Sequence, residues 1–265
     1  MVRTAIQLFT LKDIDEPVWE LIDRVGETTF DGVELYKANV DGLEDADLER
    51  AKTALEDADL SVAGCHFRAG ELEAEFDDVV RICGALDISR VVVPTYDGDA
   101  FSSIEGIEAA ADRLGAIAAD LAEHDVDLLY HNHTFEFDEV EMADGSQVAF
   151  EAFVDRADGR FGFEPDVGLA SRAGYDPIDL LEYTANQAPL VHLTDTVPED
   201  DYLLHADVGE GAVDVEACAS AAADNGAEWL VCENGRTDDG LASLDHGSEA
   251  FADFRARTGP SQQNQ

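Results

Sequence analysis

The sequence predicts an α/β protein of the (β/α)8 TIM-barrel class, in which eight parallel strands close into a ring and helices surround them. Three observations lead to this fold class. Eight short apolar or β-branched runs recur along the chain, and segments of helical periodicity separate them. The length of 265 residues suits one such barrel. Neither Gly-x-Gly-x-x-Gly nor a Walker-type Gly-Lys-Ser/Thr is present, so a nucleotide-binding doubly wound sheet is not indicated.

The strand runs and helices follow one another in regular order. The first run leads into an amphipathic segment over residues 17–27, and the second leads into a predicted helix over 45–58. We expect residues 1–257 to form a single domain and residues 258–265 to be a polar, frayed tail. The eight predicted strands are 5–9, 32–36, 60–66, 90–95, 126–129, 161–166, 190–195 and 228–233.

The chain carries an extreme negative charge. It has 60 acidic and 16 basic residues, a net charge of -44, and the acidic residues are spread over every segment. Such a surface is typical of a halophilic protein, because concentrated salt screens the self-repulsion. It argues against nucleic acid or an anionic membrane as a partner. The absence of a long apolar span and of a signal-peptide pattern predicts a cytoplasmic protein.

The four cysteines, Cys65, Cys83, Cys218 and Cys232, form no close pair in the sequence. Neither a zinc knuckle nor a disulfide framework is therefore indicated. We expect each cysteine to be a small core residue in a reducing compartment.

Two histidines follow directly after the apolar run of the fifth predicted strand. In the stretch Tyr130-His131-Asn132-His133, strand alternation places His131 and His133 on one face and Asn132 on the other. Imidazole binds metals and moves protons near neutral pH, so this pair indicates a site. The alternative is two histidines that only bond to neighbouring carbonyl groups.

Other strand runs also end in carboxylates or histidines. In a barrel the active site lies at the carboxyl ends of the strands, and a carboxylate buried there needs a partner or a metal. A mixed nitrogen and oxygen set would suit one divalent ion, with Mn, Mg, Co and Zn all open. The strand-end groups are Glu34, His66, His131 with His133, Glu164 with Asp166, His192 with Asp195, and Glu233, and the predicted metal ligands are His131, Asp166, His192 and Glu233.

Each ligand assignment has a structural alternative. Asp166 has the position of a cap for the next helix, Glu233 lies three residues before Arg236, and His192 follows an apolar run that suits a core histidine.

Five motifs together resemble the sugar phosphate isomerase/epimerase family, also called the xylose-isomerase-like barrel superfamily, over about residues 3–255. The motifs are Tyr130–His133 with Phe135–Phe137, Asp166 followed by Ala173–Pro177, Val191–Asp195, Val208–Asp214 and Val231–Glu233.

The resemblance implies a divalent metal held by the fifth to eighth strands, with Asp166, His192 and Glu233 on ligand positions. The fifth-strand ligand in the epimerases is usually Glu, and here that position is His131, with His133 as a possible substitute. Two further departures are Thr194, where many members have Lys, and Leu169, where an aromatic residue often follows the sixth-strand Asp.

The expected activity is metal-dependent isomerisation or epimerisation of a small sugar or polyol ketone through an enediolate, a reaction of carbohydrate metabolism. We expect Glu233, His133 and His66 to move protons. The predicted substrate-binding residues are Glu34, His131, Asp195, His205 and Arg236. No Arg cluster indicates a phosphate pocket, since Arg68, Arg172 and Arg236 are scattered, so the sequence favours an unphosphorylated sugar.

Three alternatives stay open at this point. An inosose-type dehydratase would use the same enediolate to expel a hydroxyl group. An apurinic endonuclease shares the superfamily, but the shortage of basic residues disfavours it. A non-catalytic sugar-binding barrel is the third, and the retention of Asp166, His192 and Glu233 argues for an enzyme. A homo-oligomer is possible in each case.

Overall fold

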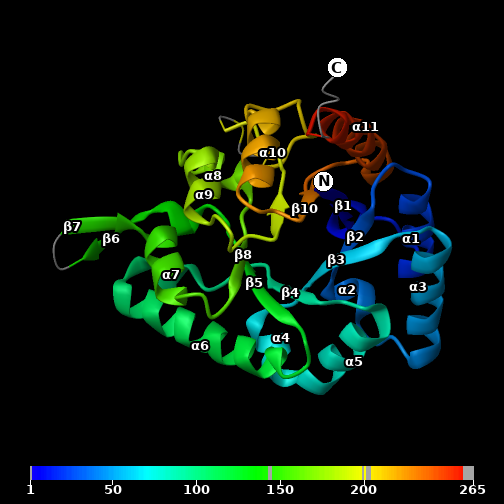
Figure 1. Ribbon diagram of the computed structural model, residues 1–265, viewed down its shortest axis with the longest axis horizontal. Helices are drawn as coiled ribbons and strands as arrows, with labels where there is room; N and C mark the ends of the chain where they lie inside the picture. The colour runs from blue at the N-terminus through cyan, green and yellow to red at the C-terminus, as the bar shows by residue number, and fades with distance from the viewer. Residues whose placement is uncertain (1, 143–144, 199, 201–203, 259–265) are drawn as a thin grey trace, which may run out of the picture.

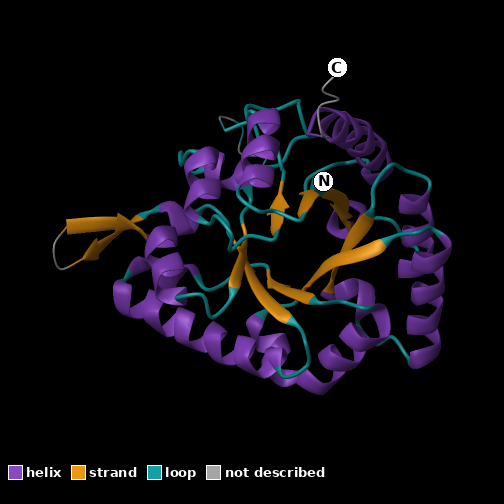
Figure 2. Ribbon diagram, viewed as in Figure 1, coloured by secondary structure: helices purple, strands orange, loops and turns teal. Residues whose placement is uncertain are grey.

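The computed structural model describes residues 2–142, 145–198, 200 and 204–258, and its centre is a sheet of eight parallel strands nearly closed into a barrel (Figures 1 and 2). The predicted fold class is confirmed. The order around the sheet is β8-β5-β4-β3-β2-β1-β10-β9. The strands are β1 (Arg3–Gln7), β2 (Gly32–Tyr36), β3 (Ser61–His66), β4 (Arg90–Val93), β5 (Asp127–His131), β8 (Gly162–Glu164), β9 (Leu190–His192) and β10 (Trp229–Cys232).

Helices surround the strands, as Figure 1 shows. The helices predicted over 17–27 and 45–58 are α1 (Val18–Gly26) and α3 (Asp45–Asp57). The others are α2 (Lys37–Val40), α4 (Ala69–Ala74), α5 (Phe76–Leu86), α6 (Ile104–Ala122), α7 (Ala149–Ala157), α8 (Val167–Arg172), α9 (Pro177–Tyr183), α10 (Val215–Asp224) and α11 (Gly240–Thr258), with short 3-10 helices η1 (Leu8–Leu11), η2 (Gly98–Ser102) and η3 (Phe135–Phe137).

Several strands are shorter than the sequence predicts, because the chain turns off the sheet early at the site end. The first run, predicted to extend to Phe9, becomes η1 at Leu8, and the Gln7 side chain accepts a hydrogen bond from the Phe9 N–H at 3.0 Å. The sixth and seventh runs end as strands at Glu164 and His192. The chain beyond these points forms loops around the site.

The two ends of the eight-stranded sheet meet at the site itself. Beyond β8, Asp166 forms an isolated parallel bridge with His192 of β9. The His192 N–H donates to the Pro165 carbonyl at 2.9 Å. Asn132 joins β5 to this junction, because its side-chain oxygen accepts from the Asp166 N–H at 2.9 Å and its amide donates to the Asp166 carbonyl at 3.2 Å. Asn132 is therefore a structural residue.

The interior of the barrel has an apolar and a polar layer. A buried apolar cluster, separate from the one that joins strands to helices, lies toward the amino ends of the strands. Gly32 makes room for it, since a Cβ there would come within 2.8 Å of the Trp229 ring. Polar side chains therefore occupy the carboxyl ends. The apolar cluster consists of Ala5, Ala63, Val92, Leu129, Leu190, Trp229 and Val231.

One element has no counterpart in the sequence prediction. Strands β6 (Glu139–Met142) and β7 (Gly145–Val148) pair in antiparallel fashion, and Figure 1 shows this hairpin extending away from the barrel. The predicted tail over 258–265 falls outside the described residues except for Thr258, the last residue of α11. The domain limit at residue 257 stays a prediction.

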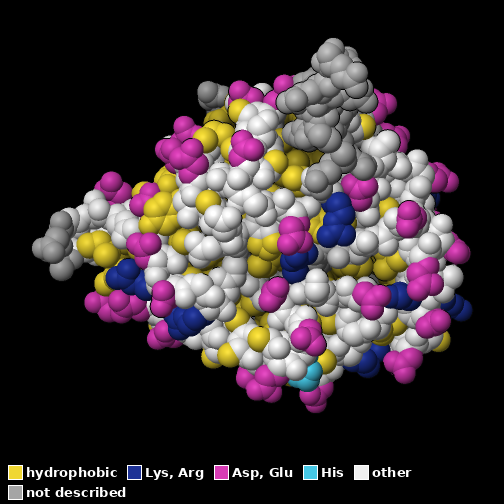
Figure 3. All heavy atoms as spheres, in the orientation of Figure 1, with side chains coloured by type: hydrophobic (Ala, Val, Ile, Leu, Met, Phe, Trp, Pro, Cys, Tyr) yellow, Lys and Arg dark blue, Asp and Glu magenta, His cyan; other side chains and the backbone are white. Residues whose placement is uncertain are grey.

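The surface agrees with the charge count, because acidic side chains are scattered over the face drawn in Figure 3 and basic ones are few. Among the helices of the described residues, none combines the length and the apolar character that crossing a membrane requires.

Candidate metal and substrate site

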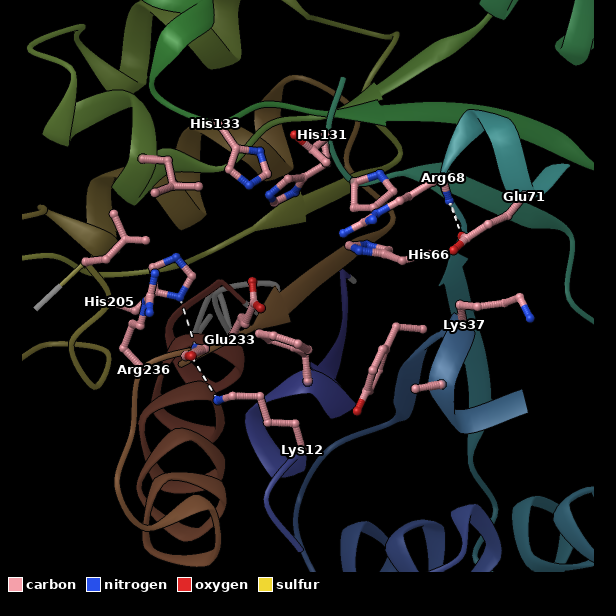
Figure 4. Close-up of a pocket in the computed structure, with 18 of the residues that line it drawn as sticks. Lys12, Lys37, His66, Arg68, Glu71, His131, His133, His205, Glu233 and Arg236 are labelled. Carbon is pink, nitrogen blue, oxygen red and sulfur yellow. Dashed lines mark hydrogen bonds between the residues drawn. The ribbon is translucent and has the colours of Figure 1, made fainter. Parts of the chain in front are cut away.

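A pocket of about 700 Å³ opens at the carboxyl ends of the strands (Figure 4). Its lining includes six predicted site residues, from β3, β5 and the loops that follow β5, β9 and β10. Those residues are His66, His131, His133, His205, Glu233 and Arg236. The strand-end rule therefore brings together groups that are far apart in the sequence.

A lower tier of buried ionisable groups lies in the barrel around Glu34. The Glu34 Oε2 atom accepts from Gln7 Nε2 at 2.8 Å, is 2.7 Å from His192 Nε2, and is 3.2 Å from His66 Nε2. The Glu164 Oε2 atom is 3.0 Å from His66 Nε2 and 3.3 Å from His192 Nε2. Neither carboxylate is exposed. The lower tier thus fixes the orientation of the imidazole rings from below.

The upper tier contains the four predicted metal ligands, which are His131, Asp166, His192 and Glu233. The His192 Nδ1 atom is 3.2 Å from Glu233 Oε2 and 4.0 Å from Asp166 Oδ2. The His131 Nε2 atom is also 4.0 Å from Asp166 Oδ2. Two ligands of one ion with bonds of about 2.0–2.2 Å are separated by about 3–4 Å. The spacing of His131, Asp166 and His192 therefore suits one shared cation, and Glu233 groups with Asp166 and His205 beside it.

Asp166 serves two purposes at once. Its Oδ1 atom accepts from the Leu169 N–H at 2.7 Å and so begins α8, as the capping alternative predicted. Thr194, at the position where relatives often have Lys, donates to the same oxygen at 2.5 Å and accepts from the Gly168 N–H at 3.0 Å. The Oδ2 atom is buried without a hydrogen-bond partner. One carboxylate is thus both a helix cap and a free ligand.

The unpartnered atoms support a cation at this level. Asp166 Oδ2 is buried and makes no hydrogen bond, and the buried His192 Nδ1 atom has only the 3.2 Å contact with Glu233 Oε2. Buried polar atoms without partners are rare in proteins because each one costs free energy. The lower-tier bond from His192 Nε2 to Glu34 leaves Nδ1 as the atom that faces Glu233, which is the arrangement that orients a metal-binding imidazole. These residues fit a divalent ion.

The pKa shifts separate the histidines into two kinds. Burial lowers the pKa of His131 well below its usual value and that of His133 to about 4, so both rings are neutral. Burial also opposes charge on His66, but Glu34 and Glu164 outweigh it and raise its pKa to about 10. Neutral imidazole binds a metal or accepts a proton, whereas His66 is a proton donor.

The carboxyl groups differ in the same way. Burial acts to raise the pKa of Glu233, but the His192 ring beside it outweighs this effect and lowers the value to about 2. Glu233 is therefore ionised. Burial and the neighbouring Glu34 raise the pKa of Glu164 to about 8. Among the described residues, Glu233 forms no ion pair with Arg236. Its carboxylate contacts His192 instead.

His205 lies within 4.8 Å of the carboxylate oxygens of Asp166 and Glu233, and its tautomer is set by the backbone. The Gly235 N–H donates to His205 Nδ1 at 3.0 Å, a bond drawn as a dashed line in Figure 4. Because Nδ1 is an acceptor, the neutral ring carries its proton on Nε2, which has no partner. Nε2 is therefore the atom of His205 that is left for a partner in the site.

His133 is positioned by a buried pair. The Glu136 Oε2 atom accepts from the His133 N–H at 2.9 Å, and Oε1 accepts from the Tyr130 hydroxyl at 2.7 Å. Burial raises the pKa of Glu136 to about 7. The pair holds the start of the loop after β5 so that His133 lines the pocket.

Two predicted substrate-binding residues lie elsewhere. Glu34 is beneath the pocket, in the lower tier. Asp195 is fully buried, and its two oxygens accept four backbone N–H bonds at 2.8–3.0 Å. Its carboxylate therefore folds the loop that follows β9. The four donors are Thr196, Gly209, Gly211 and Val213.

The sequence prediction listed Glu164 among the strand-end groups without a role, and it did not single out Gln7 or Glu136. Glu164 and Asp166 are two residues apart, so alternation puts both on the inner face, and this signal was sufficient to give Glu164 a place in the site. Gln7 ends the first strand inside an apolar run, and only the three-dimensional structure shows that it bonds to Glu34. Glu136 follows the strand by a local turn that sequence periodicity does not predict.

The fold and the site together define a (β/α)8 barrel with a buried cluster of carboxylates and imidazoles at its mouth. A family model described as "Xylose isomerase-like TIM barrel" matches residues 22–253. The chain belongs to this family. A search of curated proteins finds no match.

Solved structures with the same fold have low sequence identity. A sugar phosphate isomerase/epimerase from Parabacteroides distasonis is 17% identical with a TM-score of 0.75, and 96% of each chain is covered. A probable 3-DHS dehydratase from Bacillus anthracis is 11% identical with a TM-score of 0.78, covering 95% of this chain and 99% of the other. A D-psicose 3-epimerase from Clostridium cellulolyticum is 14% identical with a TM-score of 0.71, covering 96% and 99%. At these identities the likeness concerns the fold.

Proposed function

We propose that the protein is a divalent-metal-dependent isomerase or epimerase of a small sugar or polyol ketone, acting through an enediolate. The observation that carries the proposal is the buried, unpartnered Asp166 Oδ2 atom, 4.0 Å from both His131 Nε2 and His192 Nδ1. The names of two structural neighbours, an isomerase/epimerase and a 3-epimerase, agree with it.

We assign the cation to His131, Asp166, His192 and Glu233. When bound there, a divalent ion polarises an adjacent carbonyl and hydroxyl and makes the neighbouring C–H acidic. Three ligand positions come from strand ends that the sheet and the lower tier hold in place. Mn, Mg, Co and Zn all accept such a mixed donor set.

The proton steps belong to the side chains that line the pocket. The Glu233 carboxylate, with a pKa lowered to about 2, is ionised and accepts the substrate proton. His133, whose pKa burial lowers to about 4, is neutral and has an unpartnered Nδ1 atom, so it is the second base. His66 and the Nε2–H of His205 are the donors that return a proton or stabilise negative charge on oxygen.

A dehydratase of the inosose type is the second candidate. It uses the same C–H abstraction and then requires an acid for the departing hydroxyl. The observation that favours it is His205, whose Nε2 carries the proton because Nδ1 accepts from Gly235. The neighbour named as a probable 3-DHS dehydratase agrees with this chemistry.

Metal analysis of the purified protein, followed by incubation with ketoses and inososes in deuterated water, tests the proposal. Deuterium in a recovered or rearranged sugar identifies isomerisation or epimerisation, whereas loss of water identifies the dehydratase. A protein that binds sugars, binds no metal and exchanges no solvent deuterium into the sugar would be the non-catalytic binder.

The variant Glu233→Gln is expected to lose turnover while it keeps the folded barrel, because the amide does not accept the proton. Turnover is measured by the deuterium assay and folding by circular dichroism. Glu182→Gln, an exposed position on α9, is the matched control. Normal exchange in Glu233→Gln would overturn the assigned role.

A further inference from the structure

The rim of the pocket is richer in cations than the rest of the molecule. Four of the 16 basic residues line it, together with the acidic side chains of Asp41, Glu71 and Glu233. Across the whole chain acidic residues outnumber basic ones by 60 to 16, so a balanced rim is a local exception. The four cations are Lys12, Lys37, Arg68 and Arg236.

Two of these cations have no carboxylate partner. Lys37 pairs with Asp41 and with Glu75. Lys12 donates to the Gly235 carbonyl at 2.9 Å and lies 3.7 Å from Asp13 Oδ2. The side chains of Arg68 and Arg236 form no ion pair with any described residue.

Arginines elsewhere behave differently. Seven described arginines each pair with a carboxylate, including the exposed Arg50. Arg3 stacks on Trp229 instead, and Arg172 donates to backbone carbonyl groups. With so many carboxylates available, two unpaired guanidinium groups at one pocket are an arrangement that a ligand anion would complete. The seven are Arg24, Arg50, Arg81, Arg90, Arg113, Arg156 and Arg160.

The positions of the two guanidinium groups suit a ligand in the pocket. Arg68 follows β3, and Figure 4 shows its side chain directed toward the histidines. The dashed line near it joins the Arg68 backbone N–H to Glu71 Oε2 at 2.7 Å, so Glu71 does not occupy the guanidinium. Arg236 lies on the side of the pocket where His205 is drawn, whereas Lys37 points away from the histidines.

We propose that the substrate carries an anionic group, a carboxylate or a phosphate, and that this group binds to one of the two free guanidinium groups of the pocket lining, Arg68 or Arg236. This inference rests on the proposed function, since the reacting carbonyl and hydroxyl groups of the same molecule face the upper tier. It replaces the sequence-based preference for an uncharged sugar, which depended on Arg68 and Arg236 being far apart in the chain.

The charge of the whole molecule gives these contacts their importance. A net charge of -44 repels anions at low salt, and concentrated salt screens long-range attraction as well as repulsion. An anionic substrate is therefore held by direct bidentate hydrogen bonds, which guanidinium groups make to both carboxylate and phosphate.

Three five-carbon probes, measured by titration calorimetry at one fixed salt concentration, test the inference. They are xylitol, which is neutral, xylonate, which carries a carboxylate, and xylitol 5-phosphate. We expect at least one charged probe to bind about tenfold or more tightly than xylitol, as charge-assisted hydrogen bonds imply. The better of the two charged probes identifies the anionic group.

The double variant Arg68→Met/Arg236→Met is expected to bind the charged probe no more tightly than xylitol. Arg50→Met, on α3, is the control and should keep the preference. Equal binding of all three probes to the unaltered protein would overturn the inference, and so would a preference that survives in the double variant.

The two proposals fail separately. Divalent-metal binding is measured on the same samples, and the arginine variants should leave it unchanged. A protein that prefers charged probes through Arg68 or Arg236 but binds no metal would refute the proposed function alone. Metal-dependent turnover of neutral ketoses without any preference for anions would refute this inference alone.

Discussion

At the scale of single residues, the candidate site is built from side chains whose atoms have different partners. One oxygen of Asp166 begins α8, and the other faces His131 and His192. One nitrogen of His192 contacts Glu34, and the other contacts Glu233. Because each fixed contact determines where the second atom points, the geometry at the mouth is set from below.

The first prediction concerns Glu34. The variant Glu34→Gln removes the carboxylate that contacts His192 Nε2 and accepts from Gln7, so the ring loses its orientation. Divalent-metal affinity should fall by about 10- to 100-fold, as is usual for residues that orient a metal-binding imidazole. Competition with a chelating dye measures it. Glu56→Gln, exposed on α3, is the control, and an unchanged affinity in a folded Glu34→Gln protein would contradict the prediction.

A second prediction concerns pH and Glu136. Burial raises the pKa of this group from 4.5 to about 7, so the folded state holds the proton more tightly than the unfolded chain. The associated stability is complete below about pH 4.5 and is lost as the pH rises through 7. The loss amounts to about 3 kcal/mol. Glu136→Gln does not titrate and should escape it.

Denaturant unfolding at pH 5 and pH 8, at constant salt, measures this effect. The unfolding free energy of Glu136→Gln relative to the unaltered protein should rise between the two pH values. Glu141→Gln, exposed on β6, should show no such rise. Parallel pH dependences for Glu136→Gln and the unaltered protein would show that Glu136 is not the responsible group.

The residues that the sequence predicted share one property. His66, His131, His133, Asp166 and Glu233 each stand at or just beyond the end of an apolar run, where topology alone directs them to one mouth. Arg68 and Arg236 lie on the following loops, and their lack of partners depends on neighbours distant in sequence. No local pattern predicts that property.

At the scale of elements, the strands were predictable because apolar runs of β-branched residues alternate with helical periodicity. The β6–β7 hairpin was not, since each of its strands is only four residues long and Val140 is the one buried residue among them. The sequence indicated the loop over 205–213 only through His205 and the Val208–Asp214 motif. Its conformation depends on Asp195, whose bonds reach up to eighteen residues along the chain.

The third prediction concerns the Asp195 carboxylate, which holds this loop. Asp195→Asn replaces an acceptor oxygen with an N–H₂ group, which leaves backbone donors unpaired in a buried place. The unfolding free energy should fall by at least about 2 kcal/mol. The amides of Gly209 and Gly211 should exchange hydrogen faster, as mass spectrometry will report. Only glycine fits at position 211 beside the carboxylate, since a Cβ there would be 2.1 Å from Asp195 Oδ1.

Asp224→Asn, exposed on α10, is the matched control for this loop. It should leave both the stability and the exchange of the loop amides unchanged. Slow exchange at Gly209 and Gly211 in the Asp195→Asn protein would mean that the carboxylate does not hold the loop.

At the scale of the whole molecule, the charge of -44 sets the conditions under which the barrel is stable. The distance over which charges act grows from about 3 Å at 1 M salt to about 10 Å at 0.1 M. Repulsion between carboxylates on neighbouring helices therefore increases as salt is removed. The compact state, which concentrates the charge, suffers more than the unfolded chain.

The fourth prediction follows from this repulsion. The midpoint of thermal unfolding should fall as KCl is lowered from about 1 M to about 0.1 M. A variant in which four exposed carboxylates are replaced by amides should fall less. A midpoint that does not change with salt would contradict the prediction. The four positions are Glu49, Glu56, Asp120 and Glu123, on α3, α6 and the turn after α6.

The junction between β8 and β9 closes the barrel at the candidate site. These strands are the two margins of a ribbon that runs β8-β5-β4-β3-β2-β1-β10-β9, and they are fastened where Asp166 meets His192. The proposed metal ligands therefore come close together only when the sheet has closed into the barrel. A partly folded chain therefore lacks the metal site. A metal ion bound at the site would in turn stabilise the closed barrel against unfolding, so folding of the barrel and formation of the site are coupled.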